Sequence, residues 1–179
     1  MKKYDTIFLD RDGTLNPDPG YISNIAHYKF YPFTIEALKK LAHVCDGFCI
    51  ITNQSGIGRG LVKQKNLDEI HEYIRSEFEI HQIKLLDIYV CPDHPDQASS
   101  DRKPGTGMFT KASKKYNIDL KRSMMIGDAG SDIEAGAKLE MDTMLVLTGN
   151  GPETVEILKN IKPTIIVENL MAGAELIVS

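Results

Sequence analysis

Short apolar runs alternate with amphipathic helical patterns along most of this chain of 179 residues. Apolar runs bounded by turn residues predict buried strands, and apolar residues three and four apart predict helices. Such alternation implies a parallel sheet covered by helices on both faces. The predicted strands are 4–9, 48–51, 86–90, 123–127, 143–147 and 164–167. The predicted helices are one from 34 that Gly47 ends, 66–80, 108–116, 131–138, 153–159 and 170–177.

The length of the chain suits one domain with one substantial core. We therefore expect residues 1–179 to form a single α/β domain, a three-layer Rossmann-like parallel sheet. The longest stretch without a predicted element is 16–32, which contains three prolines and several aromatic residues. Loops of this length are usually functional or disordered, and the aromatic residues favour a folded flap. No insertion is long enough for a large cap domain.

Composition excludes several classes of function. The chain has 21 Lys and Arg against 25 Asp and Glu, a formal net charge of -4, which argues against nucleic-acid binding. The apolar run after Met1 is too short for a signal peptide or a membrane span. Three cysteines without a disulfide-type spacing favour a reducing, cytoplasmic location.

Two carboxylates stand at the predicted end of the first strand. Residues two apart on a strand share a face, so Asp10 and Asp12 are expected to converge where Gly13 lets the chain turn. Two carboxylates about 4 Å apart repel by roughly 4 kcal/mol at an effective dielectric near 20, so a cation or a shared proton is needed. The alternative is that Asp10-Arg-Asp12-Gly13 forms an ordinary solvated turn, because Asp and Gly are common turn residues.

Other polar residues stand at equivalent positions. Thr52-Asn53 follows the second strand, Asp128 follows the fourth, and Arg102-Lys103 lies in the loop after the third. Each has an alternative structural role. Thr52-Asn53 could form a capping turn, either Asp128 or Asp132 could cap the following helix, and Lys103 could be a solvated lysine. Ligands of parallel sheets bind beyond the carboxyl ends of the strands, however. Together these residues favour Mg²⁺ and a phosphoryl group.

These motifs resemble the four motifs of the haloacid-dehalogenase-like (HAD) phosphatases, in the same order. They are Asp10-Arg-Asp12-Gly-Thr, Thr52, Lys103 and Gly127-Asp128-Ala-Gly-Ser-Asp132. A closer resemblance is to the D,D-heptose bisphosphate phosphatases and the histidinol phosphatases. It rests on the stretches 8–16, 18–21, 52–60 and 102–108, of which Gly20-Tyr21 and Asn53-Gln-Ser-Gly56 favour the heptose branch.

The resemblance implies a role for each motif residue. Asp10 would be the nucleophile that becomes phosphorylated, and Asp12 the general acid/base. That role requires Asp12 to be protonated on substrate binding, which crowded carboxylates around it would favour. Thr52 and Lys103 would bind the phosphoryl oxygens. Mg²⁺ would be held by Asp10, Asp128 and the main-chain carbonyl of Asp12, and Asp132 would be either an outer-shell or an orienting residue. The implied substrate contacts are Asp18, Gly20, Tyr21, Asn53, Gln54, Ser55, Arg59 and Arg102.

One loop departs from the family pattern. Relatives commonly hold zinc with a Cys-Pro-His start and a Cys-x-Cys before Arg-Lys-Pro. Here Cys91 is retained, His94 is one place too far along, and Ser99-Ser-Asp101 replaces the second pair. Because a structural zinc site needs about four ligands, we expect no zinc.

The resemblance implies a monomeric phosphatase of a small phosphorylated sugar, most closely heptose 1,7-bisphosphate at its 7-phosphate. Histidinol phosphate is the alternative, although Arg59 and Arg102 would repel that cationic substrate. A phospho-receiver domain combines similar residues, but its phosphorylated Asp ends a later strand, and here the third strand ends in Cys91-Pro92. A catalytically inactive binding module is disfavoured because every expected catalytic residue is present.

Overall fold

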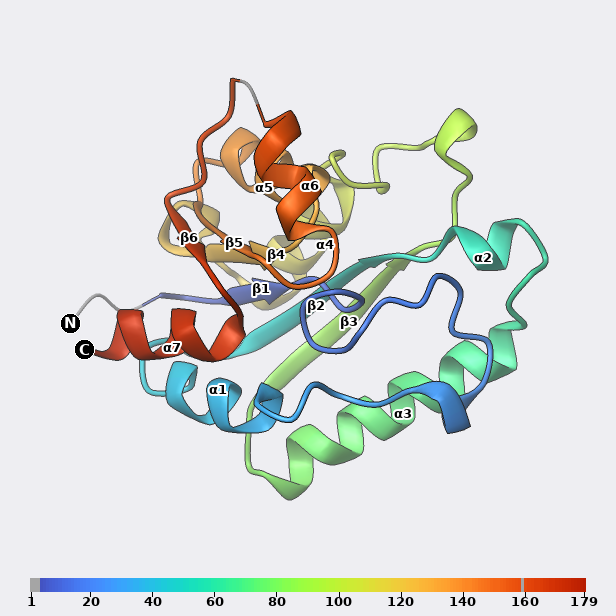
Figure 1. Ribbon diagram of the computed structural model, residues 1–179, viewed down its shortest axis with the longest axis horizontal. Helices are drawn as coiled ribbons and strands as arrows, with labels where there is room; N and C mark the ends of the chain where they lie inside the picture. The colour runs from blue at the N-terminus through green and yellow to red at the C-terminus, as the bar shows by residue number, and fades with distance from the viewer. Residues whose placement is uncertain (1–3, 159) are drawn as a thin grey trace.

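The computed structural model describes residues 4–158 and 160–179, and its centre is one parallel sheet of six strands (Figure 1). The strand order is β3-β2-β1-β4-β5-β6, so the first strand lies in the middle. The bounds are β1 Ile7–Leu9, β2 Phe48–Asn53, β3 Leu85–Cys91, β4 Met124–Gly127, β5 Asp142–Val146 and β6 Ile165–Val167. All six predicted strands are confirmed, although β1 is shorter because Tyr4 makes only an isolated bridge to Cys45.

Helices cover both faces of the sheet, which confirms the three-layer prediction. Their bounds are α1 Thr34–Leu41, α2 Ser55–Gly58, α3 Gln64–Ile80, α4 Gly107–Tyr116, α5 Gly130–Lys138, α6 Gly151–Ile157 and α7 Leu170–Val178, with 3-10 turns at Ile25–His27, Pro95–Gln97 and Leu120–Arg122. In Figure 1, α1, α3 and α7 lie below the sheet and α4, α5 and α6 above it.

Alternation along β1 divides the interior into two cores. Ile7 and Leu9 belong to the core that includes apolar residues of α1, α3 and α7, whereas Phe8 packs in the other core against Phe109 of α4. All three side chains of β1 are fully buried. The strand that leads into the paired carboxylates is therefore held on both faces.

Several predicted helix bounds differ from those observed, most by one or two residues. The helix expected to run to Gly47 ends at Leu41, because the chain then turns, with the N–H of Val44 donating to the carbonyl of Leu41. α6 begins at Gly151 and ends at Ile157, and the predicted end of that helix, residue 159, is outside the described residues. The short helix α2 was not predicted, because four residues are too few for a periodic pattern.

The segment 16–32 is folded onto the body of the protein, as predicted. Tyr28 and Phe30 are buried and contact the ring of Tyr73 on α3. Its base is fixed at the carbonyl of Leu15, which accepts hydrogen bonds from the N–H of Tyr31 and the hydroxyl of Thr34. Across residues 4–158 and 160–179, no helix combines the length and the apolar character that a membrane span needs.

Candidate active site

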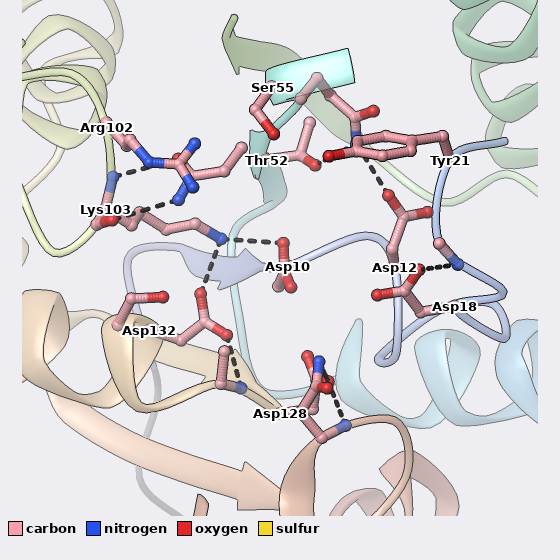
Figure 2. A pocket seen from close by; sticks show the side chains of 16 residues that line it. Asp10, Asp12, Asp18, Tyr21, Thr52, Ser55, Arg102, Lys103, Asp128 and Asp132 are labelled. Carbon is pink, nitrogen blue, oxygen red and sulfur yellow. Dashed lines mark hydrogen bonds and ion pairs between the residues drawn. The ribbon is translucent and has the colours of Figure 1, made fainter. Parts of the chain in front are cut away.

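A cleft of about 440 Å³ opens at the carboxyl ends of β1, β2 and β4. Figure 2 shows its polar side chains converging from the carboxyl ends of the central strands and from the loops around them. Its lining residues are Asp10, Asp12, Asp18, Gly20, Tyr21, Thr52, Asn53, Gln54, Ser55, Arg102, Lys103, Asp128, Ala129, Ser131, Asp132 and Asn150. The structure therefore brings together the predicted site residues, with one exception described below.

Lys103 joins two of the acids. Its buried ammonium lies 2.8 Å from Oδ1 of Asp10 and 2.6 Å from Oδ1 of Asp132. It also donates a 2.7 Å hydrogen bond to the carbonyl of Ile51. Burial alone would lower the pKa of Lys103, but the charges of Asp10 and Asp132 outweigh it and raise that pKa. Lys103 is therefore a permanent cation, and not the solvated lysine that was the alternative.

Three acids form a buried cluster. Asp10, Asp128 and Asp132 each offer a carboxylate oxygen, and these oxygens lie within 4.8 Å of one another. Burial raises the pKa of Asp10 well above its ordinary value, and Asp132 and Asp128 add to the shift against the opposing charge of Lys103. Burial, followed by repulsion from Asp132, raises the pKa of Asp128 to about 6. One lysine does not neutralise three carboxylates.

The cluster fits a divalent cation. Asp128 accepts hydrogen bonds at Oδ2 from the N–H of Asn150, at 2.7 Å, and from its side-chain amide. Its Oδ1 is buried and accepts no hydrogen bond from the described residues. Both oxygens of Asp132 are engaged, by Lys103 and by the N–H of Ala129. Asp10 and Asp128 therefore have the oxygens best disposed for a hard metal ion, and Asp132 caps α5, as its alternative role predicted.

Gly13 allows the turn after β1 to approach Asp128, which follows β4. Its φ is +85°, which disfavours other residues, and a methyl group placed on it would lie 2.2 Å from Oδ2 of Asp128. The turn between the paired carboxylates and the flap thus lies directly against the acid cluster.

Asp12 has surroundings of the opposite kind. Its Oδ1 accepts from Nε of Arg11 at 2.9 Å and from the amide of Asn16 at 2.9 Å. Its Oδ2 accepts from Nη2 of Arg11 at 2.7 Å and from the amide of Gln54 at 2.8 Å. Burial alone would raise its pKa, but Arg11 and these amides together lower it below the ordinary value.

This corrects one expectation, that carboxylates crowd around Asp12 and favour its protonation on substrate binding. Its carboxylate is surrounded by N–H donors instead, and without substrate it is ionised. Its protonation on substrate binding stays a prediction. The carboxylate of Asp12 is also outside the acid cluster, so any part it takes in binding a metal would fall to its main-chain carbonyl.

Arg11 was missed by sequence reasoning. Its side chain is fully buried, its Nη1 lies 3.2 Å from Nε2 of His71 on α3, and its guanidinium carbon lies 5.7 Å from the ring centre of Tyr28. Burial, with the charges of Arg11 and Arg75, lowers the pKa of His71 to about 3, so the imidazole is neutral. A residue between two acids gives no sequence signal that it will turn back onto one of them.

The residues at the end of β2 contact both the Asp12 group and the loop of Lys103. The amide of Gln54 donates to Oγ1 of Thr52 as well as to Asp12. Asn53 uses both ends of its amide on the main chain of Lys103, donating to the carbonyl and accepting from the N–H, each at 3.1 Å. Asn53 therefore holds the lysine loop against β2, whereas Ser55 lines the cleft beside Thr52 (Figure 2).

Two loops frame the cleft mouth. On the flap, Asp18 accepts from the N–H of Gly20, and the ring of Tyr21 is 49% exposed. On the opposite side, Arg102 donates from Nη1 to the carbonyl of Asp93 at 3.0 Å. Arg59 is the exception among the predicted contacts: it is exposed at the end of α2 and does not line the cleft.

The loop 91–103 is held by hydrogen bonds. The carboxylate of Asp93 accepts from the N–H of Ser99, His94 accepts at Nδ1 from the N–H of Asp96, and Lys111 pairs with Asp101. The group of acids around Asp10 is the one candidate metal cluster within residues 4–158 and 160–179, and it contains no cysteine. The expectation of no zinc remains a prediction.

Comparison with known proteins agrees with this geometry. A family model described as HAD-hydrolase-like matches residues 100–172. A D-glycero-alpha-D-manno-heptose-1,7-bisphosphate 7-phosphatase of Photorhabdus laumondii is 37% identical over 156 residues, which are 83% of this chain and 85% of the relative. The chain belongs to the heptose bisphosphate phosphatase family of HAD-like hydrolases. A D-glycero-beta-D-manno-heptose-1,7-bisphosphate 7-phosphatase of Pasteurella multocida is 40% identical over 157 residues, 83% of this chain and 84% of that protein.

Solved structures agree in fold as well. A D,D-heptose 1,7-bisphosphate phosphatase from B. bronchiseptica, complexed with magnesium and phosphate, has a TM-score of 0.89 and 30% identity, covering 97% of this chain and 98% of that one. The predicted superfamily and enzyme class, a phosphoric monoester hydrolase, are thereby confirmed.

Within this family site, sequence reasoning missed Ala129, Ser131 and Asn150, all of which line the cleft. Asn150 holds Asp128 and lies in the sequence Gly149-Asn150-Gly151, in the turn between β5 and α6. The signal that could have found it is the rule already used for β1, β2 and β4: polar residues at a strand end of a parallel sheet face the ligand.

Proposed function

We propose that this chain is a Mg²⁺-dependent phosphatase that removes the 7-phosphate of D-glycero-D-manno-heptose 1,7-bisphosphate through an aspartyl-phosphate intermediate. The observation that carries the proposal is the placing of Asp10 2.8 Å from Lys103, beside two further buried acids and across the cleft from Asp12. The names of the relatives supply the substrate.

Mg²⁺ would be held by Asp10 and Asp128, with the main-chain carbonyl of Asp12. The hard oxygen donors suit this ion, and the buried Oδ1 of Asp128 has no other partner among the described residues. When bound, the ion would neutralise the cluster and stabilise charge on the phosphoryl oxygens. Asp132 would act through Lys103, whose ammonium it holds at 2.6 Å.

Transfer then takes two displacements. A carboxylate oxygen of Asp10 attacks phosphorus, and the bond from phosphorus to the C7 oxygen breaks as that oxygen takes a proton from Asp12. A water next attacks the aspartyl phosphate and gives its proton to Asp12, and the bond from phosphorus to Asp10 breaks. Lys103 and the hydroxyl of Thr52 bind the phosphoryl oxygens through both steps.

Asp12 has to gain its proton when substrate arrives. A phosphate dianion beside Asp12 raises the pKa of that carboxylate through like-charge repulsion, against the pull of Arg11. Gln54 is the partner that substrate would displace, because its amide reaches Asp12 from the wall of the cleft, whereas Arg11 and Asn16 are fully buried.

Recognition of the sugar falls to the cleft mouth. Tyr21 offers an exposed aromatic ring beside Asp18 and Gly20, and Ser55 lies at the start of α2. Arg102 makes no ion pair among the described residues, so its charge is available to the second phosphate. Arg59 lies outside the cleft and would contact only a substrate that extends beyond it. We also propose a monomeric, cytoplasmic enzyme.

A substrate panel tests the function. Purified protein with Mg²⁺ is assayed for released phosphate on both anomers of heptose 1,7-bisphosphate, on histidinol phosphate and on an aryl phosphate, with Asp10→Asn as the control. We expect heptose bisphosphate to have the highest kcat/KM, with heptose 1-phosphate as product. Preference for histidinol phosphate would replace the substrate, and stoichiometric labelling without turnover would indicate a receiver domain.

A further inference from the structure

The four-residue helix α2 lies between the two loops that carry the substrate-recognition residues. Figure 2 shows Ser55, at its start, between Tyr21 on one side of the cleft and Arg102 on the other. β2 leads into α2, and its neighbour β3 leads into the loop of Arg102, so the two segments leave the sheet side by side. The N–H of Gln54, directly before α2, donates to the carbonyl of Cys91 at 2.7 Å.

Gly56 faces the flap. A methyl group placed on this glycine would lie 2.7 Å from Cδ1 of Tyr21 and 2.8 Å from Cγ2 of Val62. Val62 is buried, whereas the Tyr21 ring is half exposed and is the partner that can move. The ring of Tyr21 thus rests directly on the backbone of α2, in a position that only a residue without a side chain permits.

Gly58 faces the other loop. A methyl group placed on it would lie 2.4 Å from the carbonyl oxygen of Pro92. That obstacle is backbone, so α2 and the loop would have to separate. The next residue, Asp93, is the one whose carbonyl oxygen accepts the hydrogen bond from Arg102. Lys103 is anchored independently by the amide of Asn53, so such a movement would reach Arg102 before it reached the phosphoryl site.

We propose that α2 sets the spacing between Tyr21 and Arg102, with Gly56 and Gly58 as positioning residues for the part of the substrate that is not transferred. The inference rests on the proposed function, because it assumes that these two side chains contact the sugar and its second phosphate. In this chain, the close contact with α2 would position the loop of Arg102, a task that bound zinc would perform in relatives.

The test compares two substrates in two variants. In Gly56→Ala and Gly58→Ala, we expect kcat/KM for heptose bisphosphate to fall roughly ten- to a hundredfold, the scale of a misplacement near 1 Å. An aryl phosphate, which has no sugar to be recognised, should be hydrolysed at the wild-type rate. Gly130→Ala is the matched control, because a methyl group there has its nearest neighbour 3.7 Å away.

Double-mutant cycles separate positioning from general damage. In a Tyr21→Ala background, Gly56→Ala should have no further effect on heptose bisphosphate, and Gly58→Ala should have none in an Arg102→Ala background. Additive losses in both cycles, or an equal loss on the aryl phosphate, would overturn the inference. If Gly56→Ala folds poorly, adding Val62→Ala removes the second obstacle and leaves the contact with Tyr21.

Failure of the proposed function is distinguishable. Wild-type protein that does not turn over heptose bisphosphate overturns that function alone. The same cycles, run on whichever sugar phosphate of the panel the wild type prefers, still decide whether Gly56 and Gly58 position the two side chains.

Discussion

Asp10 and Asp12 are two residues apart, yet their surroundings are opposite. Asp10 faces two further acids and a lysine, and its pKa is raised by burial and by those acids. Asp12 faces an arginine and two amides, and its pKa is lowered. The neighbours of Asp10 come from the carboxyl end of β4, from α5 and from the lysine loop. Those of Asp12 are the adjacent Arg11, Asn16 at the start of the flap and Gln54 after β2.

The difference separates the two roles. A cluster of buried acids with too little positive charge favours binding of a cation, which in the proposed mechanism would keep Asp10 ionised as the nucleophile. A carboxylate held by four N–H donors is fixed in orientation and changes its protonation only when a new charge arrives. In the proposed mechanism, the same residue type would thus serve as nucleophile at Asp10 and as proton carrier at Asp12, according to what surrounds each.

The largest effect on turnover is expected at Asp10, within the acid cluster. Asp10→Asn keeps the size of the side chain but removes the nucleophile, so turnover should fall at least about a thousandfold. The fold should persist, since one of three mutually repelling acids is lost. Steady-state assays and circular dichroism measure the two properties. Retained turnover would mean that Asp10 is not the nucleophile.

For the corresponding change at Asp12, the loss of activity should depend on the leaving group. Asp12→Asn removes the proton donor, and we expect a loss of about 10²- to 10⁴-fold on a sugar phosphate. An aryl phosphate whose phenolate leaves without a proton should lose far less in its first step, measured as a burst of released phenol. Equal losses on both substrates would assign Asp12 a structural task instead.

The surroundings of Asp10 were predicted from the sequence better than those of Asp12. Asp10 and Asp128 were found because parallel strands place the polar residues that follow them at one edge of the sheet, a rule of topology that needs no coordinates. Arg11 was not found, because its burial depends on His71, sixty residues away on a helix whose orientation the pattern does not give. The surroundings of Asp12 were predicted wrongly for the same reason: N–H donors, and not carboxylates, lie around it.

α2 and Asn150 show two further limits. A helix of four residues containing two glycines has no amphipathic period, so its position against both loops could be seen only in three dimensions. Asn150 lies in a glycine-rich turn with the composition of any loop. Where a close approach or a long-range partner decides the role of a residue, local patterns are silent.

Metal binding should distinguish the two sides in stability as well as in activity. Chelated wild-type protein should gain about 2.7 kcal/mol in its free energy of unfolding when Mg²⁺ is added at a hundred times its Kd. Asp128→Asn should abolish most of this gain. Asp12→Asn should retain it, because the Asp12 carboxylate lies outside the acid cluster. Denaturant melts of the three proteins, with and without Mg²⁺, make the comparison, and loss of the gain in Asp12→Asn would place its carboxylate on the metal.

The smallest expected effect is on the pH dependence of the free energy of unfolding between pH 7 and pH 4, measured with a chelator present. His71 and Asp128 should change this free energy in opposite directions. His71 has its pKa lowered to about 3, so the unfolded chain binds a proton near pH 6.5 that the folded chain does not. His71 therefore costs the folded state stability as the pH falls, roughly 1 to 2 kcal/mol between pH 7 and 5. Asp128, with its pKa raised to about 6, acts oppositely: the folded chain takes up a proton first, and stability rises as the pH falls from 6 to 4.

Two variants isolate the two contributions. His71→Gln should lose less stability than wild type on acidification, and Asp128→Asn should lose more, because each substitution removes one of two opposing titrations. Denaturant melts at pH 7, 6, 5 and 4 measure both. If the two variants deviated from wild type in the same direction, the contrast between the acid surroundings of Asp10 and the nitrogen-rich surroundings of Asp12 would not extend to proton binding.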